Sequence, residues 1–215
     1  AGAEILHDRD ELFARADIIT LVNVCQPESD TKRCHLRRGQ IVIGMMDPLG
    51  KPQQARQLAD KQITGIAMEL IPRISRAQSM DALSSMATIA GYKSVVLAAG
   101  SAARIYPMLM TAAGNLDPAR VFIMGAGVAG LQAAATAKRM GAVVEAYDVR
   151  PAAREQILSV GAKPIELELE ADATEGQGGY AKEQGEAFLQ RQREQMTAVL
   201  AQQDIVITTA AIPGA

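Results

Sequence analysis

Residues 121–131 of this chain are VFIMGAGVAGL. This stretch and the residues on either side of it predict the organisation of the second half of the chain. The apolar run 121–124 predicts a buried strand, because near-continuous apolar runs beside glycine are typical of parallel sheets. The motif GAGVAG follows at 125–130, and 131–140 has the composition of a helix, with Gly141 placed as its C-terminal cap. A strand, a glycine turn and a helix in direct succession predict the start of a Rossmann unit, in which a dinucleotide binds.

Each glycine of this motif meets a physical need that a side chain would obstruct. We expect Gly125 to make the tight turn, Gly127 to let the backbone approach a pyrophosphate, and Gly130 to let the helix pack against the strand. The first N–H groups of the helix would face the phosphate oxygens, whose negative charge the helix dipole favours. The residues expected to bind the pyrophosphate are Gly125, Ala126, Gly127, Val128, Ala129 and Gly130.

The acid after the next strand bears on which dinucleotide binds. Residues 143–147 (VVEAY) predict that strand, and Asp148 follows it, roughly 20 residues after the glycine motif. A carboxylate there accepts hydrogen bonds from the adenosine ribose and repels a 2′-phosphate, which favours NAD(H) over NADP(H). Arg150 instead favours NADP(H), because an arginine can accommodate the 2′-phosphate. Val149 is the remaining residue of the expected ribose-binding segment. An alternative stays open, in which the strand, turn and helix only pack.

The remaining elements alternate in the same way, which is typical of an α/β fold. In the first half the expected strands are 17–24, 40–46 and 63–68, and the expected helix is 52–61. In the second half the expected strands are 164–169 and 204–209, and the expected helices are 152–160 and 181–203. A complete doubly wound domain has about six strands, so we expect the fold to be truncated at both ends.

A stretch of small residues and helix formers separates the two halves. Residues 79–110 are expected to form one long helix and then a shorter one, followed by a loop at 111–118. The predicted fold class is therefore α/β, with two Rossmann-like parallel-sheet subdomains joined by long helices. The expected domains are a partial first subdomain at 1–78, connecting helices at 79–118, and an NAD(H)-binding Rossmann subdomain at 119–215.

The composition argues against several classes of partner and site. The chain has 215 residues, of which 48% are hydrophobic and 21% charged, as suits a globular protein with a buried core. Aromatic residues make up 3% and the net charge is −2, so neither stacking nor charge favours a nucleic-acid partner. The chain's cysteines and histidines show no zinc-ligand spacing, so no metal site is expected. The longest uncharged run, 121–137, follows the strand–turn–helix pattern, so no transmembrane helix is expected.

Five motifs follow one another in a fixed order along the chain. They are PRISRAQSMDALSSM at 72–86, IAGY at 89–92, GAGVAG at 125–130, GGYAK at 178–182 and TTAAIPG at 208–214. In this order they resemble the NAD(H)-binding domain, the N-terminal part of the alpha subunit, of proton-translocating NAD(P) transhydrogenases in the alanine dehydrogenase/transhydrogenase superfamily. The resemblance covers nearly the whole chain, and it is closest after Pro72.

The resemblance implies an activity and a set of partners. A domain of this kind binds NAD(H) and exchanges hydride with NADP(H) held on a separate domain. A proton-translocating membrane domain couples this exchange to proton movement. The resemblance also implies a homodimer that is cytoplasmic and peripheral on the inner face of the plasma membrane.

The resemblance further assigns roles to individual residues. Arg73, Asp81 and Ser84 are expected to orient the nicotinamide and its carboxamide, and Gln78 to reach towards the NADP(H) of the partner domain. Such a loop supplies donors and acceptors where a carboxamide needs both. An alternative is that Asp81 simply lies in the first turn of a helix. The other expected nucleotide contacts are Tyr180, on a flap after the glycines of 176–179, and Thr209 and Ala210.

Two other functions stay open beside hydride exchange. Transfer between two nicotinamides needs close, oriented substrates and exclusion of water rather than an acid or base. Alanine dehydrogenases resemble this family in fold and use a histidine and a lysine. This chain has MMDP at 45–48, where that histidine would follow an apolar strand, which disfavours oxidative deamination. A third possibility is a regulatory module that binds NAD(H) without chemistry of its own.

Overall fold

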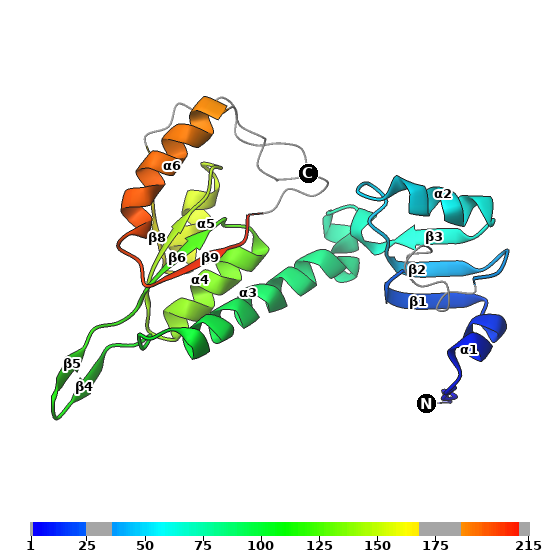
Figure 1. Ribbon diagram of the computed structural model, residues 1–215, viewed down its shortest axis with the longest axis horizontal. Helices are drawn as coiled ribbons and strands as arrows, with labels where there is room; N and C mark the ends of the chain where they lie inside the picture. Colours follow the sequence, from blue (N-terminus) through cyan, green and yellow to red (C-terminus); the bar gives the residue numbers. More distant parts are fainter. Residues whose placement is uncertain (1, 25–35, 168–185, 211–215) are drawn as a thin grey trace. The chain divides into compact units, whose positions relative to one another are not determined.

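The chain folds into two compact units, which join in sequence between Leu83 and Ser84. The computed structural model describes residues 2–24, 36–167 and 186–210. Each unit contains a parallel sheet with helices between its strands, which confirms the predicted α/β class (Figure 1).

The first unit contains a three-stranded parallel sheet in the order β1-β2-β3. Its strands and helices are β1 (Ile18–Asn23), β2 (Ile41–Met45), β3 (Thr64–Ala67), α1 (Arg9–Arg15) and α2 (Pro52–Asp60). The three strands lie where the sequence predicts them, and α2 has proline in its first turn as expected. Val42 of the central strand packs with Val24 and Ile63 in the core of this unit.

Two short 3₁₀ helices and one long α-helix follow the first sheet. They are η1 (Met68–Leu70), η2 (Ser75–Met80) and α3 (Ala82–Ser101). Among the described residues, α3 is the one helix long and apolar enough to cross a membrane. However, its Val95 is fully buried, and Ala98 and Ala99 pack against the core of the second unit. These residues therefore pack α3 on the second unit, while most of the helix surface is exposed.

The second unit contains a four-stranded parallel sheet in the order β8-β7-β6-β9. Its strands are β6 (Arg120–Met124), β7 (Val143–Tyr147), β8 (Lys163–Pro164) and β9 (Ile205–Thr208), and its helices are α4 (Val128–Arg139), α5 (Ala153–Ser159) and α6 (Glu186–Leu200). Strands β7 and β8 lie on one side of β6, whereas β9 lies on the other side. In open α/β sheets, ligands bind at the carboxyl ends of the strands beside such a reversal of order.

Helices cover both faces of this second sheet, so the sheet is the middle of three layers (Figure 1). Ile123 of β6 shares a buried cluster with Ala134 of α4, on the face that α5 also covers. The neighbouring Phe122 shares a different cluster with Met196 of α6, on the opposite face. Burial on both faces explains why β6 is an unbroken apolar run.

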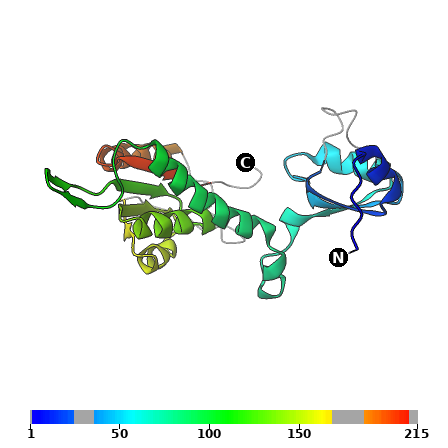
Figure 2. The same cartoon turned by 90° about the horizontal axis from the view of Figure 1, so that it is seen from below.

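The segment after α3 differs from the predicted shorter helix and loop. A β-hairpin lies there, made of β4 (Leu109–Thr111) and β5 (Gly114–Leu116) in antiparallel register. Pro107 cannot continue a helical hydrogen-bond ladder, and Gly114 has a φ of +131°, which suits a tight reversal of the chain. All six strand residues are exposed, and the hairpin projects from the second unit in Figures 1 and 2.

Two other predicted boundaries are also wrong. The sequence predicts a strand over 164–169, but among the described residues, which end here at 167, β8 takes only Lys163–Pro164, and the N–H of Ile165 still donates to Ala146 of β7. The sequence also predicts that the helix after the glycine turn begins at Leu131. It begins at Val128, because the last residues of the motif are already helical.

A buried carboxylate in β7 forms hydrogen bonds that link β6, β7 and β8, away from the glycine turn. Glu145 of β7 accepts hydrogen bonds from Gln203 at 2.7 Å, Lys163 at 3.1 Å and Arg120 at 3.3 Å. Burial by itself raises the pKa of Glu145, but the hydrogen bonds and positive charges of these partners outweigh it. The pKa therefore lies below its ordinary value of 4.5.

We expect Glu145→Gln to lower the free energy of unfolding by about 1–2 kcal/mol at pH 7, a modest figure because Lys163 is exposed. A lowered pKa in the folded state stabilises the fold above pH 4.5, and this contribution disappears as the pH falls through the folded pKa. Urea unfolding should therefore show the difference between parent and variant shrinking as the pH falls from about 7 to about 3. An equal difference at every pH would contradict the role of this charge.

Candidate nucleotide-binding site

The glycine motif forms the turn between β6 and α4, at the carboxyl edge of the second sheet. Gly125 has a φ of +97°, a left-handed conformation that residues with side chains rarely adopt. A Cβ at Gly130 would overlap the carbonyl oxygen of Gly125 and lie 2.8 Å from the Oγ1 of Thr209. A Cβ at Gly127, by contrast, would have nothing within 4 Å. The fold therefore requires the first and third glycines, whereas the second leaves open space before α4.

That open space has the chemistry of an anion site. α4 follows Gly127 with no side-chain cap, and its first turn contains no acidic residue. The first N–H groups of a helix have no partner within it, and they carry the positive end of the helix dipole. Helix N-termini with these features commonly bind anions, and the absence of a side chain at Gly127 leaves the backbone there open to approach.

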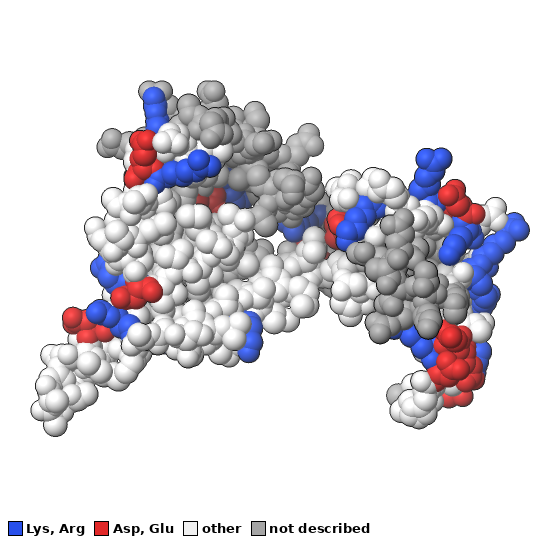
Figure 3. All heavy atoms as spheres, viewed as in Figure 1, with Lys and Arg blue, Asp and Glu red and all other residues white. Residues whose placement is uncertain are grey.

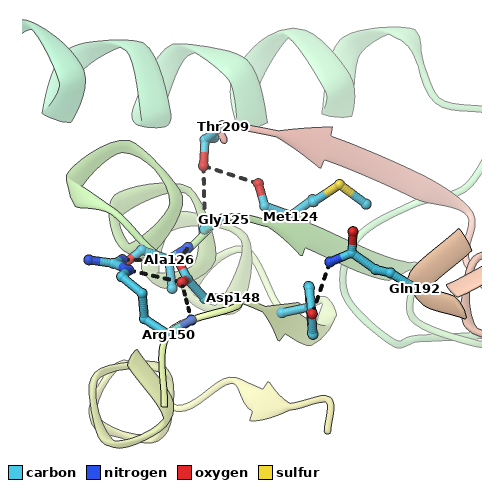
Figure 4. A network of polar contacts seen from close by, with 8 residues as sticks. Met124, Gly125, Ala126, Asp148, Arg150, Gln192 and Thr209 are labelled. Carbon is cyan, nitrogen blue, oxygen red and sulfur yellow. Dashed lines mark hydrogen bonds and ion pairs between the residues drawn. The ribbon is translucent and has the colours of Figure 1, made fainter. Parts of the chain in front are cut away.

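Thr209, which follows β9, supports the turn from the other side of β6. Its Oγ1 lies 2.9 Å from the carbonyl oxygen of Gly125 and 3.3 Å from that of Met124, within donating distance of both (Figure 4). Its N–H donates to the carbonyl of Met124 at 2.8 Å. Ala210 lies against the same turn, since a Cβ at Gly125 would be 2.9 Å from the Ala210 nitrogen. The structure thus brings Thr209 and Ala210 to the glycine motif.

Asp148 lies directly after β7, next to the glycine turn (Figure 4). Its carboxylate accepts hydrogen bonds from the N–H of Ala126 at 2.7 Å and from the N–H and Nε of Arg150, each at 2.9 Å. The guanidinium of Arg150 also donates to the carbonyl of Ala126 at 3.3 Å. The sequence predicts a ribose-binding role for Asp148, but it does not reveal that the carboxylate also holds the second residue of the motif.

These contacts keep Asp148 charged. Its side chain is only 8% exposed, and burial by itself raises its pKa. The hydrogen bonds from Arg150 and Ala126 outweigh burial, so the pKa of Asp148 lies below its ordinary value of 3.8. The carboxylate is therefore ionised at neutral pH, which is the state that accepts ribose hydroxyls and repels a phosphate.

A cavity of about 310 Å³ lies beside Asp148, between the segments that follow β7 and β8. Its apolar lining includes Val149, Pro151, Ile157 and Ile165, and its polar lining includes Arg154 and Glu166, which form an ion pair at 2.8 Å. Apolar walls with a few polar groups are typical of small-molecule sites. Sequence reasoning missed this lining because its residues come from separate segments and belong to no motif.

The predicted nicotinamide loop lies in and around η2. Arg73 and Gln78 are exposed, and the Nε of Arg73 is 4.0 Å from a carboxylate oxygen of Asp81. Asp81 directly precedes α3, and Ser84 lies in the first turn of that helix. This placement fits both the predicted loop and an ordinary helix start.

One predicted contact cannot be placed. Tyr180 and the GGYAK motif around it lie outside the described residues. In the part of the chain that the structure describes, no group of three His, Cys, Asp or Glu residues could hold a metal ion.

Models of known protein families match both halves of the chain. The model described as "Alanine dehydrogenase/PNT, C-terminal domain" matches residues 94–215, and the corresponding N-terminal domain model matches residues 1–90. This chain belongs to the alanine dehydrogenase/PNT family. The family is the one that its five ordered motifs resemble.

Curated members of the alanine dehydrogenase/PNT family divide into two groups by similarity to this chain. The first portion of the NAD(P) transhydrogenase alpha subunit of Rhodospirillum rubrum is 46% identical over an alignment of 217 positions, which covers 100% of this chain and 56% of that protein. The alanine dehydrogenase of Methanococcus maripaludis is 35% identical over 152 residues, which are 69% of this chain and 39% of that protein. This chain spans about half the length of the transhydrogenase relative.

Solved structures within the alanine dehydrogenase/PNT family show the same order of similarity. A transhydrogenase from Sinorhizobium meliloti has a TM-score of 0.75 at 46% identity, and the match covers 93% of this chain and 52% of that one. An L-alanine dehydrogenase has a TM-score of 0.57 at 21% identity, covering 76% of this chain and 45% of that one, which shows a shared fold.

Proposed function

We propose that this chain is the NAD(H)-binding part of a proton-translocating NAD(P) transhydrogenase, in which hydride passes directly between NAD(H) and the NADP(H) of a partner domain. The observation that carries this proposal is the buried, ionised carboxylate of Asp148 beside the glycine turn. Such a carboxylate accepts hydrogen bonds from ribose hydroxyls, and its ion pair with Arg150 engages the cation that could otherwise accommodate a 2′-phosphate, which favours NAD(H). The 46% identity to a transhydrogenase alpha subunit, over the whole chain, supports the reaction class.

In this proposal each part of the second unit holds one part of the dinucleotide. The N–H groups at the start of α4 hold the diphosphate, Asp148 holds the adenosine ribose, and the cavity beside it holds the adenine. The hydride comes from the nicotinamide ring of bound NADH, so no side chain has to accept or donate a proton.

The roles at the nicotinamide end rest on the resemblance to the family. We propose that Arg73, Asp81 and Ser84 orient the carboxamide, that Gln78 faces the NADP(H) of the partner domain, and that Tyr180 covers the bound nucleotide. Together they would exclude water and align the two rings for transfer.

We also propose three partners, namely the NADP(H)-binding domain, the proton-translocating membrane domain and a second copy of this chain. The site of action would then be the inner face of the plasma membrane. Exposed apolar surface supports the homodimer, since Met110 in the β4–β5 hairpin is 81% exposed and Ile89 and Leu97 of α3 are also exposed. The hairpin tip carries no charged side chain (Figure 3). Contact with an identical copy would remove such surface from water.

The test of this function is direct transfer of deuterium in a reconstituted complex. NADH that carries deuterium at the transferred position is mixed with NADP⁺, this chain and a cognate NADP(H)-binding domain. We expect the label in the NADPH product and not in the solvent, and only when both proteins are present. NADH oxidation that requires pyruvate and ammonia would instead favour an alanine dehydrogenase, and NADH binding without transfer would favour a regulatory module.

We expect Gln78→Ala to slow hydride transfer in the reconstituted complex about tenfold or more, because misalignment of reacting groups is costly in rate. NADH affinity should change by less than about twofold, since an exposed side chain that meets the partner contributes little to binding. Single-turnover rates and NADH titrations measure the two effects. Ser79→Ala, at another exposed position of η2, is the control and should change neither. An unchanged transfer rate in Gln78→Ala would contradict the bridging role.

A further inference from the structure

Helix α3 touches the proposed diphosphate-binding turn through a contact between helix backbones. α3 and α4 lie side by side in Figures 1 and 2, and Gly91 of α3 faces Ala129 of α4. A Cβ at Gly91 would overlap the carbonyl oxygen of Ala129 and lie 2.9 Å from its carbonyl carbon and 3.1 Å from its Cα. All three atoms belong to the backbone, so no side-chain rotation could relieve the overlap.

The contact falls on the part of α4 that the proposed site uses. Ala129 is the second residue of α4, so its N–H is among those without a partner inside the helix. Its carbonyl is in the position to accept the hydrogen bond of residue 133, which sets the orientation of the first turn. A displacement of this carbonyl therefore reorients the N–H groups that face the diphosphate.

The turn cannot simply move aside as a unit. Gly130 is packed against the carbonyl of Gly125 and the Oγ1 of Thr209, and Gly125 is packed against Ala210. Because Thr209 and Ala210 pack against one side of the turn and α3 against another, we expect pressure at Ala129 to deform the turn.

We propose that Gly91 is a positioning residue. Because it has no side chain, the start of α4 packs directly against α3, and this contact fixes the N–H groups that bind the dinucleotide diphosphate. The position of Gly91 supports this, because glycine inside a helix is unfavourable unless packing requires it. The inference rests on the proposed nucleotide site and adds a residue that touches no part of the nucleotide.

The experiment compares Gly91→Ala with Gly100→Ala in the full chain. Both changes replace a glycine of α3 by a better helix former, but a Cβ at Gly100 would have nothing within 4 Å. For the parent and both variants we measure the melting temperature, the dissociation constant of NADH by calorimetry, and that of adenosine by NMR titration. Adenosine carries the base and ribose but no phosphate, so it reports on the pocket beside Asp148 alone.

We expect Gly91→Ala to raise the NADH dissociation constant about tenfold or more, because charge-assisted hydrogen bonds depend on donor alignment. Its adenosine dissociation constant should stay within about twofold of the parent value, since Asp148 is not displaced. Gly100→Ala should leave both constants unchanged and should not lower the melting temperature.

An unchanged NADH affinity in Gly91→Ala, or an equal loss of NADH and adenosine affinity, would overturn the inference. If Gly91→Ala does not fold, the double variant Gly91→Ala/Gly100→Ala is measured in the same way. Failure of both to fold would also overturn the inference, because Gly91 would then serve stability alone. A parent chain that binds no NADH contradicts the proposed function itself, and that result is known before any variant is compared.

Discussion

Asp148→Ala should raise the dissociation constant of NADH by about 10-fold to 100-fold. The carboxylate is buried and ionised, so the hydrogen bonds that we propose it accepts from ribose hydroxyls would be charge-assisted, and their loss would cost about 1.5–3 kcal/mol of binding free energy. The affinity for NADPH should rise at the same time, because the charge that repels the 2′-phosphate is gone. Arg150 also loses its carboxylate partner at 2.9 Å and becomes able to bind that phosphate. Calorimetric titration with both nucleotides measures the change in preference.

Two further variants separate the roles of this carboxylate. Asp148→Asn keeps an oxygen that can accept from the N–H of Ala126, so it should weaken NADH binding less than Asp148→Ala while still improving NADPH binding. The double variant Asp148→Ala/Arg150→Ala should lose the gain in NADPH affinity, because the cation that binds the 2′-phosphate is absent. If Asp148→Ala left both affinities at the parent values, the argument for NAD(H) specificity would fail.

Gly127→Ala should reduce NADH affinity about tenfold or more and leave the fold intact. In the structure a Cβ at this position has nothing within 4 Å, so the free energy of unfolding should stay within about 0.5 kcal/mol of the parent. The methyl group would, however, occupy the space through which a diphosphate approaches the start of α4. Urea unfolding and NADH titration on the same preparation measure both effects.

Gly130→Ala is the matched comparison, because it adds the same methyl group to the same motif. Here the Cβ would overlap the carbonyl oxygen of Gly125, so the variant should lose about 1–3 kcal/mol of stability as well as nucleotide binding. If Gly127→Ala destabilised the fold as much as Gly130→Ala, or bound NADH like the parent, the open space before α4 would not be a diphosphate site.

The structure agrees with the predictions that rest on a clear pattern within a few residues, such as the glycine turn and the buried strands. The glycine turn is set by the φ of Gly125 and by the close packing of Gly130, and both needs act within a few residues. Buried parallel strands such as β6 are equally visible, because burial on both faces leaves an apolar run with no polar interruption.

Exposed apolar strands, and features that depend on long-range contacts, could not be predicted in the same way. The β4–β5 hairpin was missed because its apolar residues are exposed, whereas sequence patterns assume that apolar residues are buried. The walls of the cavity beside Asp148 come from the segments after β7 and β8, whose meeting depends on the strand order.

The contact of Gly91 could not be predicted from the sequence either, because it depends on a distant segment of the chain. Gly91 lies in the IAGY motif, yet its contact is with Ala129, in a helix that follows much later in the chain. The second role of Asp148, as the partner of the Ala126 N–H, likewise appears only when β7 is placed beside β6.

A crystal structure of this chain with NADH bound tests the central claim most directly. The account predicts the diphosphate within hydrogen-bond distance of the first N–H groups of α4, and the adenosine ribose hydroxyls on the carboxylate of Asp148. A diphosphate bound away from α4, or a ribose held by residues other than Asp148, would contradict it.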